Sequence, residues 1–98
     1  MIHLIATLTI QPGALEKVVA AAQPCIDATR KEEGCISYDL LVDVTDKKRL
    51  KFVECWENRA ALDAHFETPH LQAWRKAGGQ FFTSRHIEII SDGKVEVL

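Results

Sequence analysis

Hydrophobic residues occupy every second position between residues 2 and 10, and polar residues take most of the positions between them. This period of two predicts a β-strand with one buried face. Pro12 and Gly13 follow the segment and predict that the strand ends there. The hydrophobic positions are Ile2, Leu4, Ala6, Leu8 and Ile10.

Two more alternating segments, residues 35–43 and 49–57, are separated by the polar residues 44–48. Two such segments with a short polar connection predict an antiparallel β-hairpin. Alternation predicts that one face of this hairpin carries two sets of side chains: Ile36, Tyr38, Leu40 and Val42 from the first strand, and Leu50, Phe52, Glu54 and Trp56 from the second.

The period changes elsewhere in the chain. Residues 14–33 repeat hydrophobic side chains at intervals of three and four, which predicts an amphipathic helix. Gly34 is expected to stop this helix as its C′ residue. An asparagine at the first position of residues 58–66 predicts an N-cap and a short helix. Thr68 and Pro69 predict the start of another helix, as N-cap and first helical residue.

The remaining residues complete the expected fold. Residues 83–90 predict a last strand, and residues 91–98 a turn and a short extended tail. The resulting order predicts an α+β fold, a ferredoxin-like antiparallel sheet with helices on one face. We expect a single domain over residues 1–98, with its core at about residues 2–92. The second face of the sheet is expected to pack on a second copy, which gives a homodimer.

Composition narrows the classes of protein and partner. Hydrophobic residues make up 47% of the chain, charged residues make up 27%, and the net charge is −2, as is usual for a globular domain. No basic stripe or nucleic-acid-binding motif occurs, so a nucleic-acid partner is not expected. No segment has the pattern of a signal peptide, a membrane-spanning helix or a membrane-surface helix. Cys25, Cys35 and Cys55 form no CxxC pair, which favours reduced thiols and a cytoplasmic location.

Candidate chemistry concentrates in residues 54–74, which hold both tryptophans and two of the four histidines. His65 suits a general base, because an imidazole with a pKa of about 6.5 accepts a proton at neutral pH. The alternative is a packed core histidine. Glu54 lies between two aromatic residues on its strand face, so we expect it to pair with a cation such as Arg85 or to orient a histidine.

The histidine spacing does not predict a metal site. His65 and His70 are five residues apart, whereas a zinc motif on one helix places two histidines about four apart. No third ligand is evident in the sequence, and there is neither a glycine-rich loop nor a CxxC pair. We therefore expect no metal and no organic cofactor.

Three stretches together carry a family resemblance: "ATLTIQPG", "KEEGCISYDL" and "FVECWENRAALDAHFETPHLQAW". They resemble the antibiotic biosynthesis monooxygenase family, and in particular its small quinol monooxygenase-like members. The resemblance implies a dimeric α+β barrel with a pocket between sheet and helices in each subunit. It also implies oxidation of quinols or aromatic polyketides by dioxygen without metal or flavin. In the family mechanism, the substrate anion gives an electron to dioxygen, the radicals recombine and a quinone leaves.

Within such a pocket, we expect His65 and Glu54 to be catalytic. Tyr38 is a candidate hydrogen-bond donor to a substrate oxygen, and His70 a candidate for substrate binding. The structural alternatives stay open, because strand tyrosines and core tryptophans pack in the same way without any ligand. The expected aromatic walls for a flat substrate ring are Trp56, Phe66, Trp74 and Phe81.

Three other functions remain open. An isomerase or a degradation enzyme for a small carbonyl signalling compound would use the same base without dioxygen. A haem-degrading enzyme usually has an asparagine on the first strand, near the position where this chain has Ala6. A dimer that binds small molecules without catalysis would share the fold.

Overall fold

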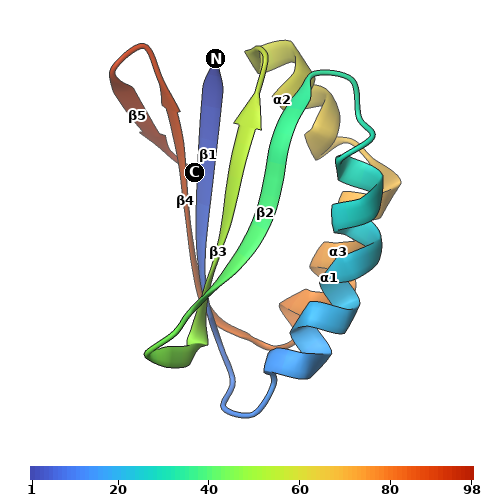
Figure 1. The fold of residues 1–98 in the computed structure, drawn as a ribbon, viewed down its shortest axis with the longest axis vertical. Helices are drawn as coiled ribbons and strands as arrows, with labels where there is room; N and C mark the ends of the chain where they lie inside the picture. The colour runs from blue at the N-terminus through green and yellow to red at the C-terminus, as the bar shows by residue number, and fades with distance from the viewer.

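The computed structural model covers residues 1–98 and contains five strands and three helices. The chain runs through one antiparallel sheet, with the helices packed against it on one side (Figure 1). In chain order the elements are β1 (Ile2–Ile10), α1 (Leu15–Thr29), β2 (Cys35–Asp43), β3 (Asp46–Trp56), α2 (Arg59–Phe66), α3 (Pro69–Gly79), β4 (Phe82–Ser91) and β5 (Lys94–Val97).

The sheet has the strand order β2-β3-β1-β4-β5, and all its neighbours are antiparallel. The first strand therefore lies at the centre, between β3 and β4, although it comes first in the sequence. This arrangement confirms the predicted α+β, ferredoxin-like sheet with helices on one face. Register pairs Leu4 with Glu54 and Ala6 with Phe52, so the inward sides of β1 and β3 form one continuous surface.

The core fills the space between this inward surface and the helices. The predicted inward residues of β1 and β3 are buried, except that Ile2 is only partly buried. Val18, Ala22 and Ile26 of α1 pack against them. Burial of these side chains supplies most of the stabilisation, at roughly 25 cal/mol per Å² of apolar area removed from water. The polar exceptions among the buried residues are Thr29, Glu54 and His65, and two of these three are candidate site residues.

The end of α1 differs from the prediction. The helix ends at Thr29, and residues 30–34 form turns instead of a last helical turn. Gly34 is therefore not the C′ residue of α1. It has a positive φ of 84° and lies against Ala61 of α2, where a Cβ atom would collide with the Ala61 side chain. The glycine thus allows the 30–34 loop to approach α2 closely.

Two strand predictions also need correction. Ile36 does not share the inward face with Tyr38, because the β2–β3 register shifts between residues 35 and 37, and Ile36 is 48% exposed. An irregularity of this kind turns one side chain out of the alternation. The expected extended tail is in part a strand, β5, since Lys94–Val97 pairs with β4.

The two predicted short helices are confirmed. Asn58 caps α2 through its side-chain oxygen, which accepts a hydrogen bond from the Ala61 amide at 2.9 Å. Pro69 opens α3 as predicted. Thr68 is the N-cap residue of α3 as predicted, but its hydroxyl donates to the His65 carbonyl at 2.8 Å and makes no capping bond to α3. This bond fixes the short link between α2 and α3, and with it the relative positions of His65 and His70.

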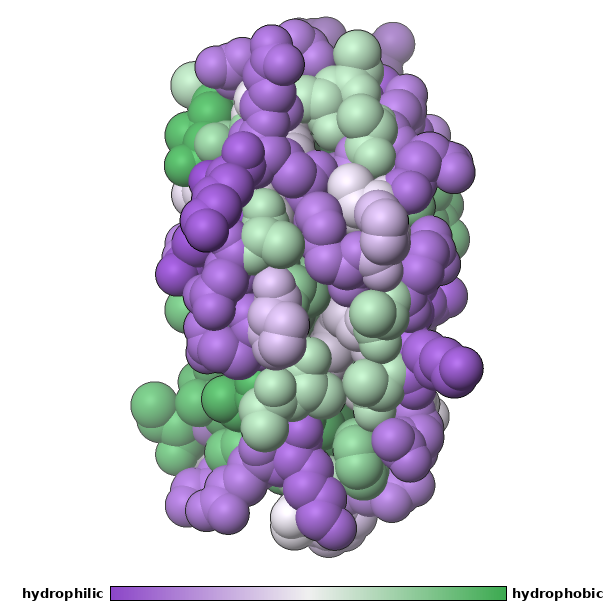
Figure 2. Space-filling view, turned by 90° about the vertical axis from the view of Figure 1, so that its right-hand side faces the viewer, coloured by the Kyte–Doolittle hydropathy of each residue, from purple (hydrophilic) through white to green (hydrophobic).

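The two outer surfaces of the molecule differ. The outer face of the helix layer is largely hydrophilic, with patches of hydrophobic residues between the charged ones (Figure 2). The opposite face of the sheet carries no helix (Figure 1). None of the helices combines the length and hydrophobicity that a bilayer crossing requires.

Candidate functional site

A cavity lies between the sheet and the helices α2 and α3. It has a volume of about 50 Å³, below the range of about 300–1,000 Å³ that is usual for drug-sized ligands. Ten of its fourteen lining residues are hydrophobic, so the site is an apolar space with few polar groups. The other four lining residues are Glu54, His65, Arg75 and Arg85, and Tyr38, one of the ten, carries a hydroxyl group.

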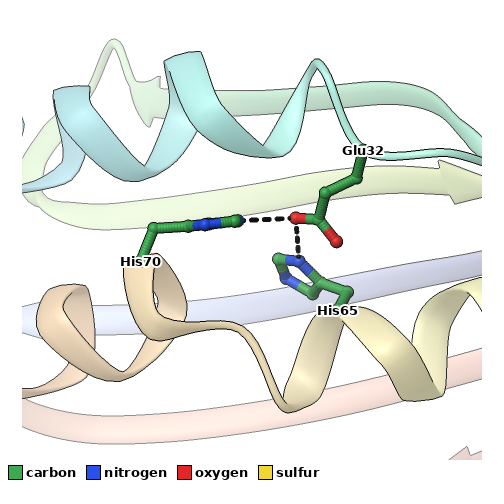
Figure 3. Close-up of side chains that lie close together, drawn as sticks. All are labelled: Glu32, His65 and His70. Carbon is green, nitrogen blue, oxygen red and sulfur yellow. Dashed lines mark hydrogen bonds and ion pairs between the residues drawn. The ribbon is translucent and has the colours of Figure 1, made fainter.

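His65 and His70 converge on a carboxylate that the sequence did not single out, Glu32. The Oε2 atom of Glu32 lies 2.8 Å from Nδ1 of His65 and 2.7 Å from Nε2 of His70 (Figure 3). The three side chains come from different elements: the loop after α1, helix α2 and helix α3. Both imidazoles therefore share a single carboxylate oxygen.

This sharing fixes the protonation pattern of His65. An ionised carboxylate only accepts hydrogen bonds, so Nδ1 of His65 carries the proton and donates it to Glu32. The neutral ring then presents a lone pair on Nε2, which has no hydrogen-bond partner in the structure. His65 lines the cavity, and the arrangement suits a proton acceptor.

Burial and Glu32 act on the His65 pKa in opposite directions. Burial lowers the pKa because it disfavours the charged imidazolium, while the hydrogen bond and the charge of Glu32 raise it. Burial is the larger effect, so the pKa lies below its ordinary value. His65 is therefore neutral at pH 7, the form that accepts a proton.

Glu54 forms a second, separate polar pair. Its Oε1 atom accepts a hydrogen bond from Nε1 of Trp56 at 3.1 Å. No ion pair with Arg85 and no hydrogen bond to His65 is formed, so Glu32 takes the histidine-orienting position that we expected for Glu54. Burial raises the pKa of Glu54 to about 7, and the Trp56 hydrogen bond offsets part of that effect. Glu54 is therefore poised to gain or lose a proton near neutral pH.

Two aromatic residues, Trp56 and Tyr38, pack against the His65 ring. Trp56 lies directly behind the imidazole, with ring centroids 4.7 Å apart, and it is completely buried. The ring of Tyr38 packs edge-on to His65 at 5.4 Å. Its hydroxyl points toward Cys25, with 3.8 Å between the oxygen and Sγ. Tyr38 thus offers its ring to the cavity, and its hydroxyl is already engaged elsewhere.

The expected site residues fall into two groups. Those that line the cavity are Tyr38, Glu54, His65, Phe66 and Trp74. Trp56 lies behind His65, and Phe81 packs on the core while its neighbour Phe82 lines the cavity. His70 lies at a shallow groove between α1 and α3 on the outer surface of the helix layer. It does not line the cavity, and it is linked to the site through Glu32 and through the His65 ring, whose centroid lies 6.3 Å from its own.

Trp74 owes its position to a glycine one turn further along α3. The indole ring lies over Gly78, where a Cβ atom would collide with the ring. Trp74 also packs edge-on against Phe52 and Phe82, each with 5.6 Å between ring centroids. These contacts hold one wall of the cavity in place.

Glu32, His65 and His70 also bear on the prediction that the protein has no metal site. The sequence offered no third ligand beside the two histidines, but Glu32 supplies one, and the ligand atoms lie within 4.8 Å of one another. Two imidazoles and a carboxylate are ligands that Zn²⁺ and Fe²⁺ accept. The 2.7 and 2.8 Å separations to a single oxygen are those of hydrogen bonds. Activity without a metal stays a prediction.

Sequence reasoning missed Glu32 and Arg75. Glu32 lies within the charged run "RKEE" of residues 30–33, where all four positions would suit a solvated turn. Only the turn geometry of residues 30–34 decides that Glu32 points inward. Arg75 follows Trp74 on α3 and lines the cavity, a position that its helical spacing from Leu71 would have suggested.

Comparison with known proteins decides the family. The model of the antibiotic biosynthesis monooxygenase family matches residues 1–77. The chain belongs to this family. This agrees with the resemblance carried by its sequence motifs, and the fold described above is the one that solved members share.

Individual relatives agree with this membership. The protein Rv0793 of Mycobacterium tuberculosis, named "Putative monooxygenase", is 34% identical over 82 residues, which is 84% of this chain and 80% of that protein. Its solved structure superposes with a TM-score of 0.83 over 92% of both chains, at 30% identity. YgiN of Escherichia coli, named "Probable quinol monooxygenase", is 28% identical and covers 95% of this chain and 99% of its own.

A further relative is longer than this chain. The protein sll1783 of Synechocystis is 43% identical over 63 residues, which is 64% of this chain. The match spans only 43% of the Synechocystis protein, and the name of that protein states no activity. These relatives support a monooxygenase-like function at the level of the family.

Proposed function

We propose that the protein is a cofactor-independent monooxygenase that oxidises a small quinol with dioxygen. The observation that carries this proposal is His65, whose Nδ1 is held by Glu32 while Nε2 remains free in an apolar, aromatic cavity. A site of this kind can remove a proton from a phenolic hydroxyl and exclude water from the resulting anion. The name of YgiN also supports a quinol as the substrate class.

The proposed reaction balances without a further reactant. His65 takes a proton from the quinol at Nε2, and the quinol anion gives one electron to dioxygen. The two radicals combine to form a C–O bond at a ring carbon, and His65 returns its proton to the peroxide. That ring carbon then loses its hydrogen as a proton, the O–O bond breaks, and the outer oxygen leaves as water. One oxygen atom then stays on the ring as a hydroxyquinone, and the other leaves in water.

Glu32 stabilises the imidazolium that forms on His65 during this step. A negative charge 2.8 Å from Nδ1 favours the protonated ring, in the way that a carboxylate supports histidine in hydrolytic triads. The low polarity of the cavity strengthens this effect, because electrostatic interactions grow as water is excluded. Glu32 is therefore a positioning residue that acts through His65.

The small cavity volume favours a substrate with a single ring. A fused polycyclic substrate needs far more than the roughly 50 Å³ available, and even one ring requires small movements of the lining side chains. Phe66 and Phe82 are only partly buried, so they can move more easily than the buried Phe52. We therefore favour a monocyclic quinol over an aromatic polyketide.

An oxygen electrode tests the proposed activity. Purified protein, dialysed against a chelator and analysed for metals, is mixed with a hydroquinone under air. We expect oxygen uptake equal to the quinol consumed, with one labelled oxygen in the product when ¹⁸O₂ is supplied. Turnover of a small carbonyl compound under nitrogen, without oxygen uptake on quinols, would instead establish the isomerase function. The proposal would also be contradicted if the protein held a stoichiometric metal and lost its activity when the chelator removed that metal.

We also propose that two copies pair through the face of the sheet that carries no helix. This face includes Ile5 of β1 and Val53 of β3, which lie directly opposite each other in the register. Both are only partly buried in the single chain, and a second copy would cover them. This pairing would form the homodimer that the sequence pattern predicts.

A further inference from the structure

Two arginines line the cavity without a carboxylate partner. Arg75 of α3 and Arg85 of β4 both belong to its lining, and neither forms a hydrogen bond or an ion pair in the structure. Arg30 and Arg59, in contrast, each pair with acidic side chains at 2.9–3.0 Å. Arg49 also has no such partner, but it lies outside the cavity. The cavity lining therefore carries two guanidinium groups that no carboxylate of the chain occupies.

Arg85 interrupts an otherwise hydrophobic strand face. It pairs with Leu8 in the β1–β4 register, and Ile87 and Ile89 follow it on the same inward side. An alternating strand would normally place another hydrophobic residue at this position. A cation there serves no packing purpose that the structure shows.

Arg75 approaches the same space from the helix layer. Its positive charge acts on both Glu54 and His65, lowering the pKa of each. It therefore lies near the two ionisable groups of the site. Arg75 and Arg85 thus face one cavity from the helix side and from the sheet side.

The two arginines define the solvent end of the cavity. Both are exposed, whereas Leu4, Leu8 and Phe52, which line the sheet side of the cavity, are buried. A ligand that enters would place its apolar ring beside the buried residues and leave its outer substituent between the guanidinium groups. Glu54, at the buried end, would repel an anionic group placed there.

We propose that Arg75 and Arg85 form an anion subsite, so that the substrate is an aromatic ring bearing a carboxylate. A guanidinium group donates two parallel hydrogen bonds to a carboxylate, which gives both affinity and orientation. The carboxylate would hold the ring with its hydroxyl toward His65. This inference deepens the proposed function, because it names a substituent of the proposed quinol substrate.

Binding of a matched ligand pair tests the subsite. The probes are 2,5-dihydroxybenzoate and its neutral amide, 2,5-dihydroxybenzamide, titrated into the full chain under nitrogen so that no oxidation occurs. Binding is followed by tryptophan fluorescence, since Trp74 lines the cavity, and by calorimetry. We expect the acid to bind at least about 10-fold more tightly than the amide, with an affinity that falls as salt is added.

Three variants make the test specific. Arg75→Gln and Arg85→Gln should each weaken binding of the acid by about 5- to 10-fold and leave the amide unchanged. Arg49→Gln removes the same charge from an exposed residue outside the cavity and should change neither ligand. Equal binding of acid and amide, or acid binding that neither cavity variant weakens, would overturn the inference.

The outcome separates this inference from the proposed activity. If the acid binds through the arginines but consumes no oxygen when air is admitted, the subsite stands and the monooxygenase proposal fails. If quinols are oxidised but the acid has no advantage over the amide, the activity stands and the subsite fails.

Discussion

Glu32 Oε2 lies 2.8 Å from Nδ1 of His65, although the two residues are 33 positions apart in the sequence. This contact assigns the proton of the neutral imidazole to Nδ1 and the lone pair to Nε2. It also brings a negative charge to the position where a protonated His65 needs it. The 30–34 loop therefore takes part in the candidate chemistry, although it belongs to no helix or strand.

Glu32→Gln should lower the turnover rate by about 10- to 100-fold. The amide keeps a similar size but loses the charge that stabilises a protonated His65, a loss of about 1.4–2.7 kcal/mol in transition-state stabilisation. Steady-state oxygen uptake measures the effect. Glu33→Gln is the matched control, since it removes a neighbouring acid that contacts neither histidine, and it should retain the wild-type rate. Equal rates for the two variants would argue that Glu32 is only structural.

His65→Ala should lower the rate by roughly 10²–10⁴-fold, the usual range for loss of a general base. Its effect on stability should stay within about 0.5–3 kcal/mol, which urea denaturation measures. His86→Ala, an exposed histidine on β4, is the control. His70→Ala should have a smaller effect on the rate than His65→Ala. An active His65→Ala enzyme would leave His65 as a packing residue.

The activity should fall at low pH with a midpoint below about 6.5, the ordinary histidine value. Burial lowers the pKa of His65, so the ring stays neutral and able to accept a proton at pH values where a free histidine is charged. The rate is therefore retained as the pH drops through 6.5 and is lost only below the lowered pKa. A pH profile of kcat/KM measures this midpoint. A midpoint above 6.5 that persists in His65→Gln would point to Glu54 as the titrating group.

Glu54→Gln should stabilise the protein above pH 7. The pKa of Glu54 rises from 4.5 to about 7 on folding, so the native state holds one more proton than the unfolded state between these pH values. The contribution of Glu54 to the free energy of unfolding is fully present below pH 4.5 and is lost as the pH rises to 7. At about 1.4 kcal/mol per pKa unit, the cost above pH 7 is about 3 kcal/mol.

Comparing the wild-type protein with Glu54→Gln isolates the cost of ionising Glu54 in the folded state. Glutamine keeps an oxygen that accepts the Trp56 hydrogen bond but cannot ionise. Urea denaturation at pH 4.5 and pH 8 should show a larger advantage of Glu54→Gln at the higher pH. His65 contributes the opposite trend below its ordinary pKa, but both proteins share it. An advantage that is the same at both pH values would mean that Glu54 ionises without a folding cost.

The protein should sediment as a dimer at micromolar concentration. The sheet face without helices would form the contact, and stable interfaces of this kind often exceed about 2,000 Å² in total. Analytical ultracentrifugation distinguishes this from a monomer of 11.0 kDa. Val53→Lys would place a charge at the proposed contact and should shift the equilibrium toward monomer. Val19→Lys, the same change at an exposed valine on helix α1, is the control and should leave the dimer intact. A wild-type mass of 11.0 kDa would contradict the proposal.

The sequence predicted the elements that have a regular hydrophobic period. It did not predict side-chain positions that depend on a single turn or register shift. Alternation in β1 and β3 predicted the inward faces correctly, because the pleat of a strand imposes a period of two. The outward position of Ile36 depends on a register shift that no period encodes. The inward position of Glu32 depends on α1 ending at Thr29, before the run of polar residues that the sequence pattern assigns to the helix.

The candidate site shows the same division. His65 and Trp74 were found because both residue types carry chemistry or aromatic surface and lie at helical spacings. Arg75 and Glu32 were missed because exposed arginines and glutamates are common on any surface. Only the three-dimensional arrangement shows that one faces a cavity and the other bridges two histidines.

Gly78 gives the chain a simple means of setting the capacity of the site. Because the Trp74 indole occupies the space where a side chain at position 78 would lie, alanine there would push the ring toward the cavity and reduce its volume. Such a change would exclude larger rings while every lining residue kept its identity. The size of the cavity thus depends on a residue that is not part of its lining.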